Sequence, residues 1–291
     1  MSRLALLSLT VLAIWSLPSS AQAGQGDRLV KAQLLADTAA VQPGKPFQLG
    51  VLLKIESSWH IYWKNAGDSG LPTRVKLKLP PGFTAGEVQF PVPTRIDLPG
   101  DIANFAYENE VMLIVPVTPP AELASGAPLT ISADVNWLVC QEQCMPGKAS
   151  VSLDLPVSNS ATGANTELFG KWMKAMPTAD ASATLAGPPQ YKYAPDVGAS
   201  GPVSGDVSVT LRWKTPPKSA TWFPEELGDN ARLKDLKIKT DQGVTTITFA
   251  VAADKAADLP KRVDGVLAFE LPDGTRRGVS FAVPLMFSPG G

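Results

Sequence analysis

Short runs of alternating apolar and polar residues recur along the first half of the chain, and turn signals such as Pro80-Pro81-Gly82 separate them. A period of two is typical of strands with one buried face. Several short strands at this spacing predict an immunoglobulin-like antiparallel β-sandwich over residues 24–158. The expected strands are Phe47 to Ile55, His60 to Lys64, Val75 to Leu79, Val111 to Val117, Leu129 to Val139 and Ala149 to Leu155.

The spacing of the apolar residues along the chain changes after Val157. Apolar residues between Thr166 and Met176 recur at helical spacing, and Pro177 ends the run. This pattern predicts a short helix whose apolar stripe packs on a domain. The stretch Ala179 to Gly205 is rich in Ala, Gly, Pro and Ser, and we interpret it as a linker. Residues 159–205 are therefore expected to form a helix and a linker.

Alternation returns in residues 206–291 and predicts a second, smaller β domain, with Asp241-Gln242-Gly243 as a hairpin turn. This segment contains neither cysteine nor histidine, so we expect it to bind or brace and not to catalyse. The fold class of the whole chain is therefore mainly β. The expected strands are Val207 to Trp213, Leu236 to Lys239, Val244 to Val251, Val266 to Glu270 and Gly278 to Val283.

The N-terminus has a pattern of another kind. An almost unbroken apolar stretch, Leu4 to Leu17, follows Arg3, and Ala21-Gln22-Ala23 supplies a small-x-small cleavage pattern. A membrane-spanning helix needs about 20 apolar residues. The shorter stretch, followed by a cleavage pattern, predicts a signal peptide over residues 1–23. We therefore expect the chain to be exported and to begin at Gly24 after cleavage.

Composition removes several classes of function. The chain has 26 Lys and Arg residues against 27 Asp and Glu residues, and it has no basic tract. This balance lacks the electrostatic footprint that a phosphate backbone requires, so nucleic acid is not expected as a partner. One histidine and no nucleophile-elbow, P-loop or zinc-protease pattern leave little basis for hydrolase or nucleotide chemistry. We expect no cofactor.

The chain contains two cysteines, Cys140 and Cys144. In an extended strand, residues four apart are separated by roughly 13 Å, whereas a disulfide needs Cα atoms about 4.4 to 6.8 Å apart. The chain must therefore bend over Gln141-Glu142-Gln143 to join them, and we expect the pair at an exposed tip. Closing so small a ring stabilises a fold little by chain entropy. Strained, accessible disulfides tend to be labile or catalytic, so we favour a redox pair over a structural brace.

Three segments carry a resemblance to a known family: Trp137 to Pro146, Ser58 to Pro72 and Tyr107 to Val111. Together they resemble the periplasmic N-terminal part of the DsbD thiol:disulfide interchange family. They are most similar to its ScsB branch, which is linked to copper tolerance. The resemblance is strong in the first domain and extends more loosely over the helix and the second domain around Trp222-Phe223-Pro224. It implies an immunoglobulin-like domain located in the periplasm.

The resemblance also implies an activity. Cys140 and Cys144 would be the redox pair of a protein-disulfide reductase component that exchanges through transient mixed disulfides. Electrons would come from a separate membrane-embedded donor of the DsbD or CcdA type, since the sequence holds no membrane helices of its own after the signal. They would pass to oxidised thioredoxin-like proteins of the periplasm. The short cysteine spacing leaves open which cysteine attacks first, with Cys144 favoured.

Neighbours of the cysteines follow from the same resemblance. His60 and Tyr62 fall where the family places aromatic residues beside the active pair. The stretch Asp97 to Phe105, which includes Leu98, falls where a cap loop shields the sulfurs. Motion of that loop is expected to gate exchange.

A second hypothesis is periplasmic copper binding by Cys140, Cys144 and Met145, with His60 as a further ligand. Thiolate, thioether and imidazole groups suit copper. However, Cys-x-x-x-Cys is a loose metal signature, and an oxidising compartment keeps thiols paired. We therefore rank copper binding below exchange, and a scaffolding protein with an inert disulfide last.

Overall fold

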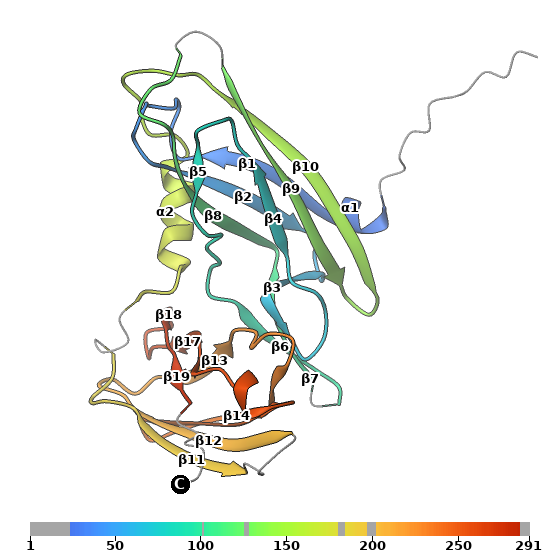
Figure 1. Cartoon of the computed structure of the whole chain (residues 1–291), viewed down its shortest axis with the longest axis vertical. Helices are drawn as coiled ribbons and strands as arrows, with labels where there is room; N and C mark the ends of the chain where they lie inside the picture. The colour runs from blue at the N-terminus through green and yellow to red at the C-terminus, as the bar shows by residue number, and fades with distance from the viewer. Residues whose placement is uncertain (1–23, 101, 125–127, 180–183, 197–201, 286–291) are drawn as a thin grey trace, which may run out of the picture.

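The structure is a computed structural model that describes residues 24–100, 102–124, 128–179, 184–196 and 202–285. The predicted signal peptide, residues 1–23, lies outside the described residues. Figure 1 shows two β-rich halves, one above the other, with the helix α2 (Thr166–Ala175) at the side of the upper half. Antiparallel pairing dominates in both halves, so the prediction of a mainly β fold is confirmed. Among the described residues, no helix has the length and apolar character needed to cross a membrane.

The upper half is a sandwich of two antiparallel sheets, as predicted. One sheet has the order β1 (Val30–Ala36), β2 (Phe47–Ile55), β8 (Glu110–Thr118) and β5 (Thr84–Ala85). The other has the order β10 (Cys144–Leu155), β9 (Leu129–Cys140), β3 (His60–Gly67), β7 (Ile102–Glu108) and β6 (Thr94–Leu98), and β4 (Arg74–Lys78) also pairs with β9. A short helix, α1 (Gln25–Leu29), precedes β1.

Strands β6 and β7 differ from the expectation, because the stretch Asp97 to Phe105 was predicted to be a loop. The two strands form a hairpin whose register runs from Thr94 opposite Ala106 to Leu98 opposite Ile102. Strand β7 is buried at five successive positions, so its sequence shows no period of two. Periodicity alone therefore could not reveal this strand.

The main core lies between the two sheets of the upper half. Large side chains such as Trp63, Leu49 and Ile131 are fully buried there. The helix α2 packs on the sheet that contains β2, as its apolar stripe predicts. Phe169 lies so close to Gly50 that a Cβ added to this glycine would be 3.0 Å from the Phe169 Cζ.

The lower half contains two further antiparallel sheets and a short pair. One sheet has the order β11 (Gln190–Asp196), β12 (Val203–Arg212), β15 (Val244–Ala253) and β14 (Ala231–Asp241), and the other β13 (Ser219–Pro224), β17 (Gly265–Glu270) and β18 (Arg276–Ser280). The pair is β16 (Arg262–Val263) with β19 (Val283–Pro284), and η1 (Ala256–Asp258) is a 3₁₀ turn. Both sheets contribute to one core that includes Trp222 and Phe249.

The linker prediction over Ala179 to Gly205 is wrong in part. Strand β11 and the beginning of β12 lie within it, in register from Gln190 opposite Thr210 to Asp196 opposite Ser204. The strand β11 is short and contains a proline, which concealed it in a segment rich in Pro, Ala and Gly. The strand β11 forms because it pairs with β12, and its own sequence does not show this pairing.

The two halves share a hydrophobic interior. Phe223 of β13 lies against Trp63 and Phe105 of the upper half, with ring centroids 6.2 and 5.0 Å apart. The Asn65 Nδ2 donates a hydrogen bond to the Pro224 carbonyl oxygen at 2.8 Å. Phe223 therefore belongs to the main core of the upper half although it is part of the lower half.

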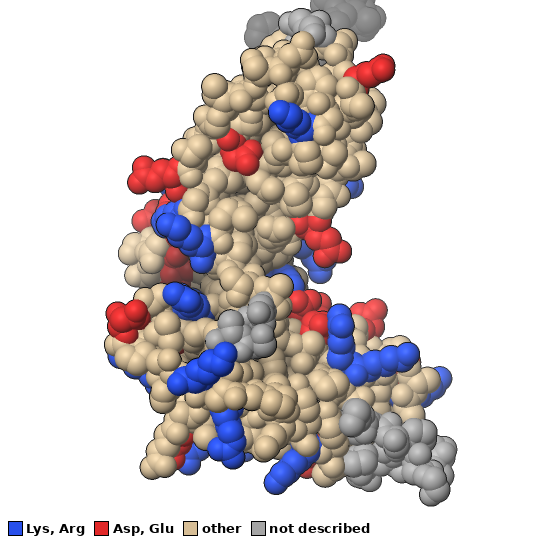
Figure 2. Space-filling model, turned by 90° about the vertical axis from the view of Figure 1, so that its left-hand side faces the viewer, with Lys and Arg blue, Asp and Glu red and all other residues tan. Residues whose placement is uncertain are grey.

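The charged surface is mixed. Figure 2 shows one face of the molecule, on which acidic and basic side chains both occur with uncharged surface between them, and basic side chains prevail on the lower half. The formal net charge of the whole chain is −1.

Candidate functional site

The two cysteines lie at the tip of the β9–β10 hairpin. Cys140 and Cys144 are cross-strand partners, and a disulfide joins them with their Cα atoms 4.1 Å apart. Between them the chain makes a tight turn, in which the Gln141 amide donates a hydrogen bond to the Gln143 carbonyl oxygen at 3.1 Å. The bend expected between the cysteines is therefore present.

The disulfide lies on the outer face of its sheet. Val139 belongs to the main core, whereas Cys140 belongs to a separate small cluster with Tyr62 and Ala66. Successive side chains of a strand point to opposite faces, so the Cys140 sulfur lies on the side of the sheet away from the sandwich interior. Cys140 is only 2% exposed, whereas Cys144 is exposed. The expectation of an exposed pair therefore holds for Cys144 and is wrong for Cys140.

Strand β3 brings two of the predicted neighbours to the disulfide. His60 is the cross-strand partner of Cys140. The Tyr62 hydroxyl donates a hydrogen bond to the Cys140 Sγ at 3.1 Å and lies 4.0 Å from the Cys144 Sγ. The His60 Nε2 is 3.4 Å from the same hydroxyl. One hydroxyl group therefore contacts both sulfurs and the only histidine of the chain.

Burial shifts the pKa values of both His60 and Tyr62. It lowers the pKa of His60, and the negative charge of Glu108 offsets part of this effect. The imidazole is therefore mainly neutral at neutral pH. Burial raises the pKa of Tyr62, so the phenol keeps its proton and remains a hydrogen-bond donor. A donor beside sulfur stabilises the negative charge that forms when a disulfide opens.

A loop from Asp68 to Pro72, between β3 and β4, covers Tyr62. Gly70 has a φ of 102°, and a Cβ added to it would be 2.3 Å from the Tyr62 Cζ, so the close approach requires glycine. The Ser69 amide and hydroxyl both donate to the Asn104 Oδ1, at 3.2 and 2.9 Å. The Asn104 Nδ2 in turn donates to the Tyr62 hydroxyl at 3.5 Å. Ser69 lies in the motif Ser58 to Pro72 and Asn104 in the expected cap stretch, but their hydrogen bonds were not foreseen, because no local pattern connects positions so far apart.

The structure does not bring the other predicted neighbours to the cysteines. On β7, the residue that pairs with His60 is Glu108, whereas Asp97 and Leu98 pair at the opposite end of that strand. Asp97 and Leu98 instead line a groove of about 990 Å³ between the β6–β7 hairpin and the lower half. Phe105 packs in the main core against Trp63. Asp97, Leu98 and Phe105 therefore lie away from the sulfurs, whereas Asn104 of the same stretch contacts the Tyr62 hydroxyl. Asp101 lies outside the described residues.

The copper ligand set is not assembled around the closed disulfide. Met145 packs against the main core, whereas Cys140 belongs to the cluster on the outer face. Within the part of the chain that the structure describes, no three or more His, Cys, Asp and Glu residues are grouped so that they could hold a metal ion. The thioether and the buried sulfur therefore face different sides of the sheet.

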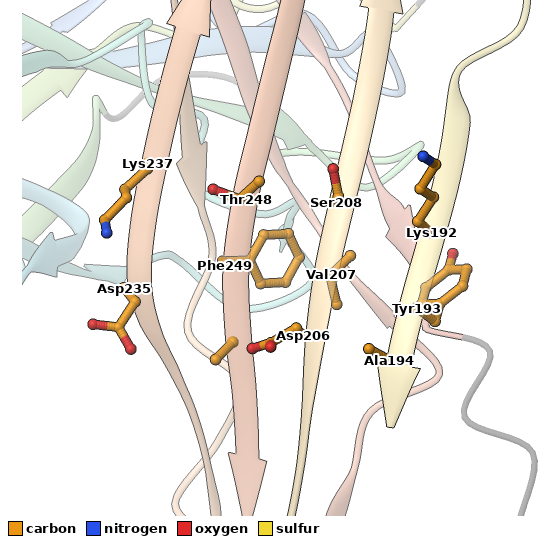
Figure 3. A pocket seen from close by; sticks show the side chains of 11 residues that line it. Lys192, Tyr193, Ala194, Asp206, Val207, Ser208, Asp235, Lys237, Thr248 and Phe249 are labelled. Atoms are coloured by element: carbon orange, nitrogen blue, oxygen red, sulfur yellow. The ribbon is translucent and has the colours of Figure 1, made fainter. Parts of the chain in front are cut away.

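A second hollow lies in the lower half and has a volume of about 550 Å³. Its lining comes from β11, β12, β15 and β14, and Figure 3 shows these side chains along the four strands. Lys192, Ser208, Thr248 and Lys237 form one row across the sheet. The lining contains neither cysteine nor histidine, so we assign no sulfur chemistry to it.

Comparisons with known proteins agree with this arrangement. The family described as thiol:disulfide interchange protein DsbD, N-terminal, matches residues 29–156. The crystal structure of the N-terminal periplasmic domain of ScsB from Proteus mirabilis is similar, with a TM-score of 0.56 and 13% identity over 88% of this chain and 92% of that chain. No curated protein matches the sequence.

Two crystal structures of BcpA, the major pilin subunit of Bacillus cereus, are much less similar. Their TM-scores are 0.29 and 0.27 at 10% identity, over 89% of this chain and 67% of theirs. Scores this low carry no argument about the fold. The family match and the ScsB likeness instead agree with the resemblance found in the sequence. Residues 29–156 therefore match the DsbD N-terminal family, and the fold of the chain is similar to that of the ScsB N-terminal periplasmic domain.

Proposed function

We propose that this chain is a periplasmic thiol-disulfide exchange protein, a component of a protein-disulfide reductase system. The observation that carries the proposal is a hairpin disulfide that joins one exposed residue, Cys144, to one buried residue, Cys140, beside a hydroxyl donor. The match of residues 29–156 to the DsbD N-terminal family supports the same chemistry. The predicted signal peptide and the ScsB likeness support a periplasmic location.

The geometry supports a definite order of bond changes. A thiolate of the electron donor attacks the Sγ of the exposed Cys144, and the Cys140–Cys144 bond breaks. Cys140 leaves with the electron pair as a thiolate, which the Tyr62 hydroxyl stabilises, while a mixed disulfide forms between the donor and Cys144. The donor's second thiol then attacks the donor's first sulfur in the mixed disulfide and releases Cys144 as a thiolate. The donor dithiol is thereby oxidised to a disulfide, and both cysteines of this chain are reduced.

The second half of the cycle reverses these roles. The reduced Cys144 attacks a disulfide of the acceptor and forms a mixed disulfide with it. Cys140 then attacks the Cys144 sulfur, closes the hairpin disulfide and releases the acceptor as a dithiol. We propose a separate membrane-embedded protein of the DsbD or CcdA type as donor and oxidised thioredoxin-like proteins of the periplasm as acceptors.

Trapping of mixed disulfides tests this function. A Cys140→Ala variant keeps the exposed cysteine and lacks the resolving one, so incubation with an oxidised thioredoxin-fold protein is expected to leave a stable mixed disulfide visible by mass spectrometry. A Cys144→Ala variant, whose remaining cysteine is buried, is expected to trap at least tenfold less. If neither variant forms a mixed disulfide, the exchange function is wrong.

The same variants test the copper hypothesis. In the reduced protein, one equivalent of Cu(I) bound tightly, together with no trapped partner, would favour copper binding over exchange. A Met145→Leu variant separates the two functions further, because the thioether is needed only as a metal ligand. We expect this variant to exchange at the rate of the unchanged protein.

A further inference from the structure

Asn104 is a fully buried polar residue next to the disulfide site, with 0% exposure. Its side chain lies between the loop residue Ser69 and the Tyr62 hydroxyl. A buried amide is costly unless its polar atoms are paired. The partners of Asn104 therefore determine how its amide is oriented.

Ser69 determines which end of the amide faces Tyr62. The backbone N–H of Ser69 can only donate, so the Asn104 atom at 3.2 Å from it must be the acceptor oxygen. The Ser69 hydroxyl donates to the same oxygen at 2.9 Å. Both lone pairs of that oxygen are thereby occupied. The amide nitrogen, a donor only, is left to face the Tyr62 hydroxyl.

The orientation of Asn104 in turn directs the proton of Tyr62. A phenol has one O–H donor, and it cannot donate to an N–H group. The remaining acceptors in reach are the Cys140 Sγ at 3.1 Å, the His60 Nε2 at 3.4 Å and the Cys144 Sγ at 4.0 Å. The Cys140 sulfur is the nearest of the three, and a disulfide sulfur can only accept. The network therefore runs in one direction, from Ser69 and Asn104 to Tyr62 and then to sulfur.

We propose that Asn104 is a positioning residue that, held by Ser69, directs the Tyr62 hydroxyl proton onto the Cys140 sulfur and so stabilises the thiolate that leaves when the disulfide opens. This inference rests on the proposed exchange function and deepens it. It assigns the buried polar network a role in the rate of exchange. It also explains why a loop with an exposed surface is anchored to a buried amide.

The rate at which dithiothreitol reduces the oxidised chain tests this role, because a small dithiol needs no docking surface. A hydrogen bond to a charged group is worth about a factor of ten or more in an equilibrium or rate constant. We therefore expect Tyr62→Phe to slow reduction about tenfold. Asn104→Asp, which keeps the shape but accepts the Tyr62 proton, is expected to slow it by a similar factor.

A double-mutant cycle separates positioning from other effects. Asn104→Asp also adds negative charge, which repels a thiolate whether or not Tyr62 has its hydroxyl. The uncharged Asn104→Leu variant avoids this effect. In the Tyr62→Phe background, Asn104→Leu is expected to leave the rate unchanged, whereas in the unchanged protein it slows reduction several-fold. An equal slowing in both backgrounds would overturn the proposal.

Thr73→Val is a matched control. The Thr73 hydroxyl is buried nearby and donates to the backbone oxygen of Tyr62 at 2.7 Å, so its loss perturbs the same residue without touching the phenol. We expect no change in the reduction rate. The lower thiol pKa of the reduced pair, measured by absorbance at 240 nm, gives a second readout, which Asn104→Leu raises and Thr73→Val leaves unchanged.

The outcomes distinguish this proposal from the function on which it rests. If dithiothreitol does not open the disulfide of the unchanged protein, the exchange function fails and the positioning role fails with it. If the unchanged protein is reduced readily and the Asn104 variants that fold react at the same rate, only the positioning role is wrong. Thermal unfolding of each variant identifies those that fold.

Discussion

At the residue scale, the burial of His60 should make the free energy of unfolding depend on pH. Its pKa is lowered in the folded protein, chiefly by burial, so between that value and 6.5 the unfolded chain binds more protons than the folded one. The contribution of His60 to the free energy of unfolding is therefore complete above pH 6.5, and it decreases as the pH falls from 6.5 towards the pKa of His60 in the folded protein. We expect urea unfolding to show this decrease in the unchanged protein and a flatter profile in a His60→Gln variant.

A second variant checks the cause of the shift. Glu108 raises the pKa of His60, against the larger effect of burial. Glu108→Gln is therefore expected to lower the pKa of the His60 imidazole further in an NMR titration. A pKa for His60 at or above 6.5 in the unchanged protein would contradict the burial of this ring.

The residues with unusual chemistry could be predicted from the sequence, whereas the hydrogen-bond network around them could not. Cys140, Cys144, His60 and Tyr62 lie in recognisable motifs, and the structure places them together. Asn104 lies in the expected cap stretch but was not singled out, because its partner Ser69 is 35 residues away and its contacts are tertiary. Phe105 was expected beside the cysteines but packs in the main core. It follows Asn104 in strand β7, and successive side chains of a strand point to opposite faces of the sheet.

At the element scale, the β9–β10 hairpin should survive reduction of its disulfide. The register of the two strands continues far from the cysteines, to Leu129 opposite Leu155. A bond that closes a ring across a sequence separation of 4 stabilises the fold by about 2 kcal/mol or less on the chain-entropy model. We expect reduction to lower the melting temperature by only about 4 to 8 °C and to leave the far-ultraviolet circular dichroism unchanged. Unfolding on reduction would indicate a structural disulfide.

The loop over Tyr62 gives a second prediction at this scale. Gly70→Ala introduces a Cβ that clashes with the Tyr62 ring and also disfavours the φ of 102°. We expect it to destabilise the fold by about 2 to 4 kcal/mol, because a positive φ alone costs a residue with a Cβ about 1 to 2 kcal/mol.

Gly100→Ala is the matched control for this loop. Gly100 has a φ of 89° but nothing within 4 Å of an added Cβ. It should therefore show the backbone cost of about 1 to 2 kcal/mol alone. Equal losses of stability in the two variants, measured by urea unfolding, would contradict the close packing of Gly70 on Tyr62.

Strand prediction succeeded for β2 and β9 and failed for β1, β7 and β11. The strand β2 has the predicted bounds, Phe47–Ile55, and β9 exceeds its prediction by one residue. The strand β7 is buried on both faces, and β11 contains a proline and lies among Ala- and Gly-rich residues. Such strands are defined by their partners in the sheet, which a single sequence does not show.

At the scale of the whole molecule, the shared interior should make the two halves unfold together. Phe223 is fully buried against Trp63 and Phe105. Phe223→Ala is expected to destabilise the fold by about 3 to 5 kcal/mol and to separate the single thermal transition into two. Calorimetry checks this, because loss of the contact between the halves uncouples their unfolding.

Phe249→Ala is the control for this prediction. Phe249 is also buried, but it lies inside the core of the lower half, against Trp222. Its loss should destabilise the protein by a similar amount, yet it leaves the contact between the halves in place. If the Phe223 variant keeps one transition, as we expect for the Phe249 variant, the halves do not depend on this contact for their coupling.

The redox equilibrium of the hairpin disulfide with glutathione tests the exchange function most directly. Structural disulfides of exported proteins typically have potentials below about −300 mV, whereas exchange proteins lie at higher values. With Cys144 exposed and the Cys140 sulfur beside Tyr62, the Cys140–Cys144 pair is predicted to equilibrate with glutathione buffers, with both forms populated. A pair that stays fully oxidised in a large excess of reduced glutathione would contradict the proposal.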